Sequence, residues 1–101
     1  MRFRFKTEKL LALYTNREGA KKYPRQVVES FFEVMAIVDA AKDERDLYAF
    51  KGLRFEKLSG RRKDERSLRL TGQWRLTLTI EHGEQGNCLV IQEIVDYHPK
   101  S

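Results

Sequence analysis

The spacing of apolar residues changes near residue 50, and this change limits the folds open to the chain. Before it, apolar side chains recur at three- and four-residue steps, the period of a helix with one buried face. After it they occupy every second position, the period of a strand. The helical stripe comprises Val27, Phe31, Val34, Met35, Val38 and Ala41, and the alternating row comprises Trp74, Leu76, Leu78 and Ile80. Helices followed by antiparallel strands predict an α+β fold.

Local signals predict the remaining elements. Arg and Phe alternate over residues 2–6, which predicts a first strand, and Thr7 is a suitable cap for a short helix over 7–16. Pro24 suits the first turn of the longer helix. The second half predicts a short edge strand over 53–58, a hairpin of 67–70 and 73–81, a turn at 82–87 and a last strand over 88–96. We therefore expect two N-terminal helices packed on one face of a small antiparallel sheet.

Length and composition indicate one domain spanning residues 1–101. A single core usually needs about 100 to 150 residues, and 41% hydrophobic with 35% charged residues is an ordinary globular balance. The one cysteine, Cys88, excludes an intramolecular disulfide, and no apolar run approaches the roughly 18 residues that span a bilayer. The N-terminus alternates charged and aromatic residues and lacks the apolar stretch of a signal peptide. We expect a soluble, cytoplasmic protein.

The net positive charge is concentrated in one quarter of the chain. Residues 51–75 contain nine basic and three acidic residues, whereas the other 76 residues contain 11 basic and 12 acidic ones. Such a concentration attracts polyanions, of which phosphate backbones are the commonest in a cell. A basic face that only keeps the protein soluble explains the charge equally well.

Alternation along the hairpin places Arg75 on the sheet face opposite the apolar row. Asp96 and His98 share one parity on the last strand, provided that this strand stays regular to its end. If that parity coincides with the Arg75 face, one surface gathers Arg69, Arg75, Asp96 and His98, and the basic loop 60–66 closes one side. The prediction depends on the register of the last strand.

Basic side chains beside a histidine and a carboxylate suit cleavage of an RNA phosphodiester. A base takes the proton of the ribose 2′-hydroxyl, an acid protonates the leaving 5′-oxygen, and guanidinium groups stabilise the extra phosphoryl charge. RNA carries its own nucleophile, so this chemistry requires no metal, and no spacing of His, Cys and Asp suggests a metal site. We expect no cofactor, an exposed and inert His82, and a packing role for Cys88.

Several segments in the second half together form a recognisable pattern. They are Gly52-Leu53-Arg54-Phe55-Glu56-Lys57-Leu58-Ser59-Gly60, Arg62, Ser67-Leu68-Arg69-Leu70, Gln73-Trp74-Arg75-Leu76 and Glu93-Ile94-Val95-Asp96-Tyr97-His98. In these segments the sequence resembles HigB-type toxins, members of the RelE/ParE superfamily. The N-terminal half agrees with that family only in its layout of strand, short helix and longer helix. The resemblance implies a RelE-like fold and a toxin that enters the ribosomal A site and cleaves the mRNA there.

The resemblance also implies roles for individual residues. Glu56 falls at the position of a proposed general base, although some HigB proteins have a histidine there and a lysine in place of Ser59. Whether Glu56 or Asp96 acts as the base therefore stays open. Arg75 matches the arginine that steadies the scissile phosphate, and His98 matches the general acid. RNA-binding roles fall to Lys57, Arg61, Arg62, Lys63, Arg69 and Tyr97, the last by stacking on an unpaired base.

The partner that the resemblance implies is a HigA-like antitoxin with a helix-turn-helix domain, through which the complex would bind operator DNA. The ribosome and mRNA are the other implied partners. Two further functions remain open at this point. ParE-like relatives are described as non-catalytic poisons of DNA gyrase, and a basic module that binds RNA without cutting it would need the same charge. Glu56, Arg75 and His98 together favour the endoribonuclease.

Overall fold

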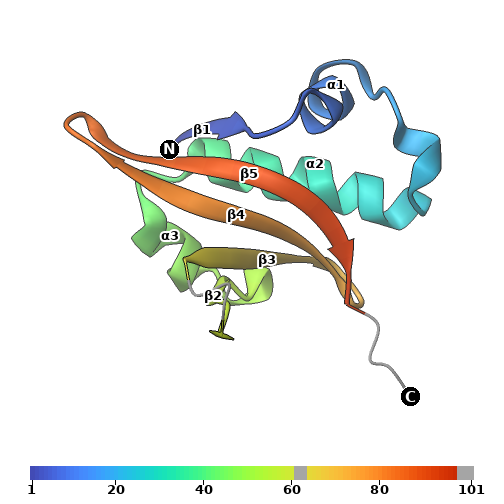
Figure 1. Ribbon diagram of the computed structural model, residues 1–101. Coiled ribbons are helices and arrows are strands. Elements are labelled where there is room, and N and C mark those ends of the chain that lie inside the picture. Colours follow the sequence, from blue (N-terminus) through green and yellow to red (C-terminus); the bar gives the residue numbers. More distant parts are fainter. Residues whose placement is uncertain (61–63, 98–101) are drawn as a thin grey trace.

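The computed structural model describes residues 1–60 and 64–97 (Figure 1). In this part of the chain a five-stranded sheet has the order β1-β5-β4-β3-β2, and helices precede most of the strands, so the predicted α+β class is confirmed. The elements are β1 (Arg2–Phe5), α1 (Glu8–Asn16), the 3-10 turn η1 (Ala20–Lys22), α2 (Arg25–Ala40), α3 (Glu44–Ala49), the 3-10 turn η2 (Lys51–Leu53), β2 (Glu56–Lys57), β3 (Glu65–Thr71), β4 (Trp74–Gly83) and β5 (Gly86–Asp96).

Residues at the ends of the first two helices explain where these helices begin and end. The side chain of Thr7 accepts a hydrogen bond from the Leu10 N–H at 3.4 Å, which confirms the predicted cap of α1. Helix α1 ends at Arg17, which adopts a left-handed backbone with φ of 57°. Pro24 directly precedes α2 and its carbonyl accepts from the Val28 N–H. No helix in residues 1–60 and 64–97 is long and apolar enough to cross a membrane.

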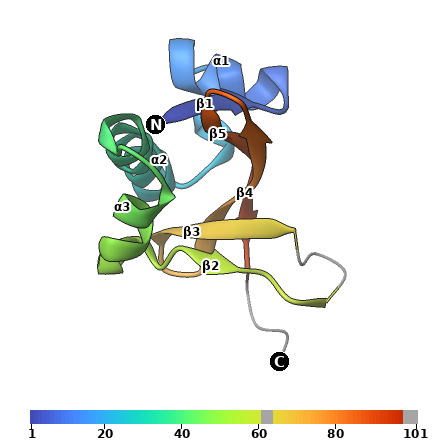
Figure 2. The same ribbon diagram turned by 90° about the vertical axis from the view of Figure 1, so that its left-hand side faces the viewer.

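The core forms where α2 packs across one face of the sheet. All six residues of the predicted helical stripe are buried, as are Leu76 and Leu78 of β4. Phe31 is completely buried at the centre and its ring contacts those of Phe5, Tyr14 and Phe32. Figure 2 shows α2 and α3 on the same side of the strands. One apolar cluster therefore joins the N-terminal helices to the C-terminal strands.

Two features of the sheet and helices differ from the prediction. The sheet is mixed, because β1 pairs in parallel with β5, with Arg4 opposite Val90. The first and last strands are far apart in the sequence, so only packing of the whole core brings them together. Local sequence carries no signal for that contact.

The sequence does not predict the third helix, α3, because its six residues are too few to show a period. Asp43 caps this helix by accepting from the Arg45 N–H.

The predicted hairpin is confirmed, with longer strands than expected. Thr71 pairs with Trp74 across the turn, where Gly72 has φ of 56°, a conformation that favours glycine. The strands β4 and β5 continue into the predicted turn of 82–87 and leave a shorter one between Gly83 and Gly86. The edge strand is shorter than the predicted 53–58, since only Glu56–Lys57 pair with β3.

A cavity in this core should strongly lower the free energy of unfolding. Phe31→Ala should lower the free energy of unfolding by about 3 to 5 kcal/mol, because the fully buried ring leaves a void that its neighbours cannot fill. Leu11→Ala on the solvent side of α1, where the side chain is 46% exposed, should change it by less than about 0.5 kcal/mol. Urea denaturation followed by circular dichroism measures both, and equal effects would show that α2 is not the centre of the core.

Candidate active site

Strand pairing places Arg75 on the face of the sheet that α2 does not cover. Arg75 lies opposite Arg69 on β3 and Val95 on β5, and directly paired residues of antiparallel strands point to the same side. Its neighbour Leu76 points to the other side and is completely buried in the core. The predicted orientation of Arg75 is therefore confirmed, and Trp74 packs partly buried against the core beside Tyr23.

The side chain of Arg75 lies across β3 and is held by several contacts. Its Nε donates to the Ser67 hydroxyl at 2.8 Å, and its Nη2 donates to the Arg54 backbone carbonyl at 2.6 Å. The Ser67 carbonyl lies 3.5 Å from Nη2. The side chain is only 17% exposed, so the guanidinium occupies a defined position instead of moving freely in solvent.

Glu56 meets Arg75 at this position. Glu56 pairs with Ser67 across the β2–β3 edge, so its side chain points to the Arg75 face. The Glu56 Oε2 atom lies 3.7 Å from Arg75 Nη2, and the Glu56 side chain is 57% exposed. The structure therefore brings together two of the predicted catalytic residues, from strands that lie on either side of β3, with the carboxylate accessible from solvent.

The expected place of Asp96 on the same face is wrong. Asp96 pairs with Trp74 and Val95 pairs with Arg75, so Asp96 shares the Trp74 side of the sheet. The cause is an irregularity in β5: Ile91 pairs with Leu78 and Glu93 pairs with Thr77, which leaves Gln92 as an extra residue. One inserted residue moves every later side chain to the other face.

The predicted RNA-binding residues in the described part of the chain do not all share the face of Arg75. Arg69, its partner across the strands, is exposed on the same face. Tyr97 is 38% exposed, and its N–H donates to the Gln73 carbonyl at 2.9 Å, which keeps the end of β5 beside the β3–β4 turn. Lys57 is exposed but pairs with Arg66, so it points to the opposite side from Glu56.

Four further predicted site residues lie outside the described residues. They are Arg61, Arg62 and Lys63, between Gly60 and β3, and His98, directly after Tyr97.

Sequence reasoning missed the two groups that hold Arg75. Ser67 is completely buried, and its hydroxyl accepts from the Arg75 Nε. Arg54 contributes its backbone carbonyl, which no side-chain motif reveals. The parity of β3 does place Ser67 on the face of Arg69, but a serine in a strand carries no signal of its own. The contact depends on the alignment of three strands.

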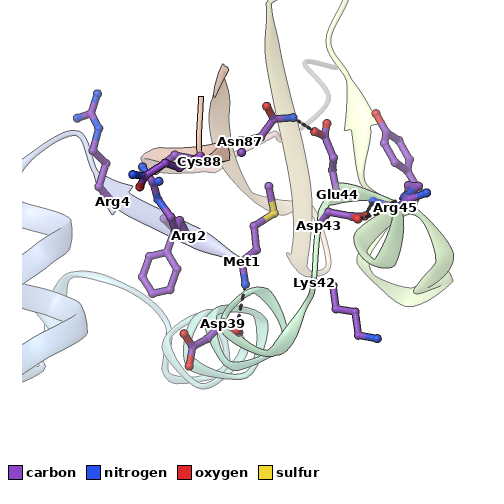
Figure 3. A pocket seen from close by; sticks show the side chains of 14 residues that line it. Met1, Arg2, Arg4, Asp39, Lys42, Asp43, Glu44, Arg45, Asn87 and Cys88 are labelled. Atoms are coloured by element: carbon purple, nitrogen blue, oxygen red, sulfur yellow. Dashed lines mark hydrogen bonds and ion pairs between the residues drawn. The ribbon is translucent and has the colours of Figure 1, made fainter. Parts of the chain in front are cut away.

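A separate groove of about 1230 Å³ lies near the β4–β5 turn, between β1 and the start of α3 (Figure 3). Gly83 lies eight positions after Arg75 along β4, or about 26 Å along an extended strand. Two carboxylates at the α3 side of the groove already have partners within the protein: Asn87 donates to Glu44, and hydrogen bonds from Arg45 lower the pKa of the Asp43 carboxyl. None of the predicted site residues is among the described residues that line this groove.

Comparison with known proteins identifies relatives in sequence and in fold. The chain is 34% identical over 76 residues to Toxin HigB-1 of Vibrio cholerae serotype O1 (strain ATCC 39315 / El Tor Inaba N16961), a match that covers 75% of this chain and 80% of that protein. A YoeB/ParE toxin from Agrobacterium tumefaciens has a similar structure, with a TM-score of 0.56, 14% sequence identity and coverage of 97% of this chain and 100% of that one. At that identity the likeness shows the fold alone.

A match to a family model shows to which protein family the chain belongs. Residues 3–98 match the HigB-like toxin family, described as the RelE-like toxin of the type II toxin–antitoxin system HigB. This match spans nearly the whole chain and includes every residue of the candidate site. The chain therefore belongs to the HigB-like family of RelE-like toxins from type II toxin–antitoxin systems.

Proposed function

We propose that this HigB-like toxin is a ribosome-dependent mRNA endoribonuclease that inhibits translation. The observation that supports this most is the position of the Arg75 guanidinium, held on the exposed sheet face with the Glu56 carboxylate 3.7 Å away. A cation that binds phosphate and a base that accepts a proton must both reach one phosphodiester and its neighbouring 2′-hydroxyl. Groups less than about 4 Å apart meet that requirement.

The pairing of two arginines favours an anionic ligand. Arg69 lies directly opposite Arg75 on the neighbouring strand, and like charges at such positions destabilise a sheet. Glu56 offsets part of this repulsion from 3.7 Å. A bound phosphate offsets more, because guanidinium groups bind phosphate oxygens through paired, charge-assisted hydrogen bonds. This face of the sheet is therefore better suited to RNA than to an uncharged ligand.

In the proposed reaction Glu56 removes the proton of the ribose 2′-hydroxyl, and the 2′-oxygen attacks the adjacent phosphorus. The bond from phosphorus to the 5′-oxygen breaks, so the products carry a 2′,3′-cyclic phosphate and a 5′-hydroxyl. Arg75 stabilises the negative charge that develops on the phosphoryl oxygens. His98, the residue after Tyr97, protonates the leaving 5′-oxygen. Because RNA supplies the nucleophile, the reaction involves no metal-bound water.

The remaining basic and aromatic residues would hold the RNA and the ribosome. Tyr97 would stack on an unpaired base, and Arg69, Lys57 and the run from Arg61 to Lys63 would contact phosphates. A toxin of this family implies an antitoxin, and we propose a HigA-like helix-turn-helix protein, through which the complex would bind operator DNA. We propose that the toxin acts in the cytoplasm, where its ribosomal substrate is.

Loss of Arg75 should abolish activity without unfolding the protein. Arg75→Ala should lower the rate of mRNA cleavage on purified ribosomes by about 10²- to 10³-fold, because the developing phosphoryl charge loses its main stabilising group. Arg75→Lys should remain strongly impaired, since an ammonium group cannot form the paired hydrogen bonds. Arg25→Ala, at an exposed arginine of α2, is the control and should cleave at the normal rate. A fully toxic, folded Arg75→Ala protein would show that the site is elsewhere.

Glu56 and His98 should each be required for proton transfer during cleavage. Glu56→Gln should lower the maximum rate by about 10²-fold, because an amide cannot take the proton of the 2′-hydroxyl. His98→Ala should also lower the rate, because the leaving 5′-oxygen loses its proton donor. Single-turnover cleavage tests both, with Glu29→Gln on α2 as the control for charge. A Glu56→Gln protein that cleaves at the normal rate would assign the base to another group.

Binding of phosphates by the basic run should appear as salt dependence. The triple variant Arg61/Arg62/Lys63→Ala should bind ribosomes more weakly, and the slope of log K against log salt should fall by about 0.7 for each phosphate that the variant no longer neutralises. Equilibrium binding at several salt concentrations gives this slope. An unchanged slope would mean that the ribosome binds another face.

Pulse labelling after induced expression separates this function from its alternatives. Incorporation of amino acids should stop before incorporation of thymidine. The opposite order would favour a ParE-like action on DNA gyrase, and continued growth would favour a module that binds RNA without cutting it.

A further inference from the structure

We propose that Ser67 and the backbone carbonyl of Arg54 are positioning groups, which hold one edge of the Arg75 guanidinium so that its other edge binds the scissile phosphate. The inference rests on the proposed function, in which Arg75 contacts that phosphate. Neither Ser67 nor Arg54 touches the reacting atoms in this scheme. Both act through Arg75.

The two hydrogen bonds occupy a single edge of the guanidinium. Nε and Nη2 lie on the same side of this planar group, and they donate to the Ser67 hydroxyl at 2.8 Å and to the Arg54 carbonyl at 2.6 Å. The end of the group, formed by Nη1 and the second hydrogen of Nη2, has a matching pair of donors. Among residues 1–60 and 64–97, Nη1 makes no hydrogen bond or ion pair, and the Glu56 Oε2 atom lies 3.7 Å from Nη2, beyond hydrogen-bond distance. This end is the edge available for two phosphate oxygens.

Ser67 is suited to this role by its burial. Its side chain is completely inaccessible to solvent, so its hydroxyl must find a partner within the protein, and the Arg75 Nε is that partner. The side chain of Arg75 covers Ser67 as it crosses β3. A hydroxyl that water cannot reach holds the arginine more rigidly than an exposed one, because no solvent molecule competes for the bond.

The conformation of Arg54 supplies the second acceptor. Arg54 adopts a left-handed backbone, with φ of 45° and ψ of 54°, directly after η2. Such angles are uncommon for residues other than glycine and are often found at functional sites. In this structure they accompany the turn of the chain from η2 into β2, at which the carbonyl accepts from the Arg75 guanidinium.

Both acceptors are neutral, so they hold the guanidinium of Arg75 without adding a negative charge beside it. A carboxylate on this edge would fix the arginine but would also offset its positive charge. A hydroxyl and a carbonyl fix it without adding to the negative charge of Glu56, which already lies 3.7 Å from Nη2. A charged group already oriented in the free enzyme needs no rearrangement as the phosphoryl charge develops.

A matched pair of variants tests the role of Ser67. Ser67 and Thr77 are direct partners across β3 and β4, and both are completely buried. Ser67→Ala removes the hydroxyl that contacts Arg75, whereas Thr77→Val removes a hydroxyl that donates to the Glu93 carbonyl. Ser67→Ala should lower the cleavage rate at saturating ribosomes by about 10- to 100-fold, with less than about a threefold change in the half-saturating concentration. Thr77→Val should change the rate by less than about threefold.

The arginine itself provides a readout that does not depend on activity. In the wild-type protein, nuclear magnetic resonance should show slow hydrogen exchange at the Arg75 Nε–H, slower than at Arg25, whose side chain is 91% exposed. The slow exchange should persist in Thr77→Val and be lost in Ser67→Ala. If the wild-type Arg75 Nε–H exchanges as fast as that of Arg25, the positioning role is excluded, whether or not Ser67→Ala folds.

The outcomes separate this inference from the proposed function. If Arg75→Ala cleaves mRNA at the normal rate, the proposed site is wrong and the positioning role is excluded with it. If Arg75→Ala is inactive while Ser67→Ala and Thr77→Val behave alike in both rate and exchange, the proposed function stands and only the role of Ser67 is excluded.

Discussion

Burial of Leu76 and Leu78 against the helical layer is the interaction on which the rest of the structure depends. Both side chains are completely buried, and they determine which face of β4 points to α2. A shift of one residue in the pairing of β4 would expose them and turn Arg75 into the core. Because that exchange would bury a charge and expose two leucines, the core selects the register. The position of the candidate active site therefore follows from hydrophobic packing on the opposite face.

Several features around Arg75 reduce stability locally, and each is consistent with a site for an anion. Two arginines face each other across neighbouring strands, Arg54 has a left-handed backbone, and a buried serine depends on one contact. Structural packing alone would favour an apolar or oppositely charged pair at the position of Arg69 and Arg75. Proteins keep such local costs where function requires them, and the surrounding strands hold the arrangement in place.

Local patterns in the sequence were sufficient for part of the fold. The stripe from Val27 to Ala41 predicted α2, Thr7 predicted the cap of α1, and the segments 67–70 and 73–81 predicted the hairpin, because periodicity and capping act over a few residues. The parallel pairing of β1 with β5 could not be predicted in this way, since it joins the two ends of the fold. Helix α3 is too short to show a period. The extra residue at Gln92 was also missed, and it reversed the expected face of Asp96.

For the candidate site, the sequence by itself determined the composition and one orientation. It has a basic second half, it resembles a toxin family from Gly52 onward, and two-residue alternation sets the side of β4 on which Arg75 lies. Only the tertiary structure decided which of these groups meet. The order and register of β2, β3 and β4 place Glu56 beside Arg75, and the same alignment brings Ser67 and the Arg54 carbonyl to the guanidinium. Alternation specifies a direction within one strand, whereas contact between strands depends on registers that the whole core selects.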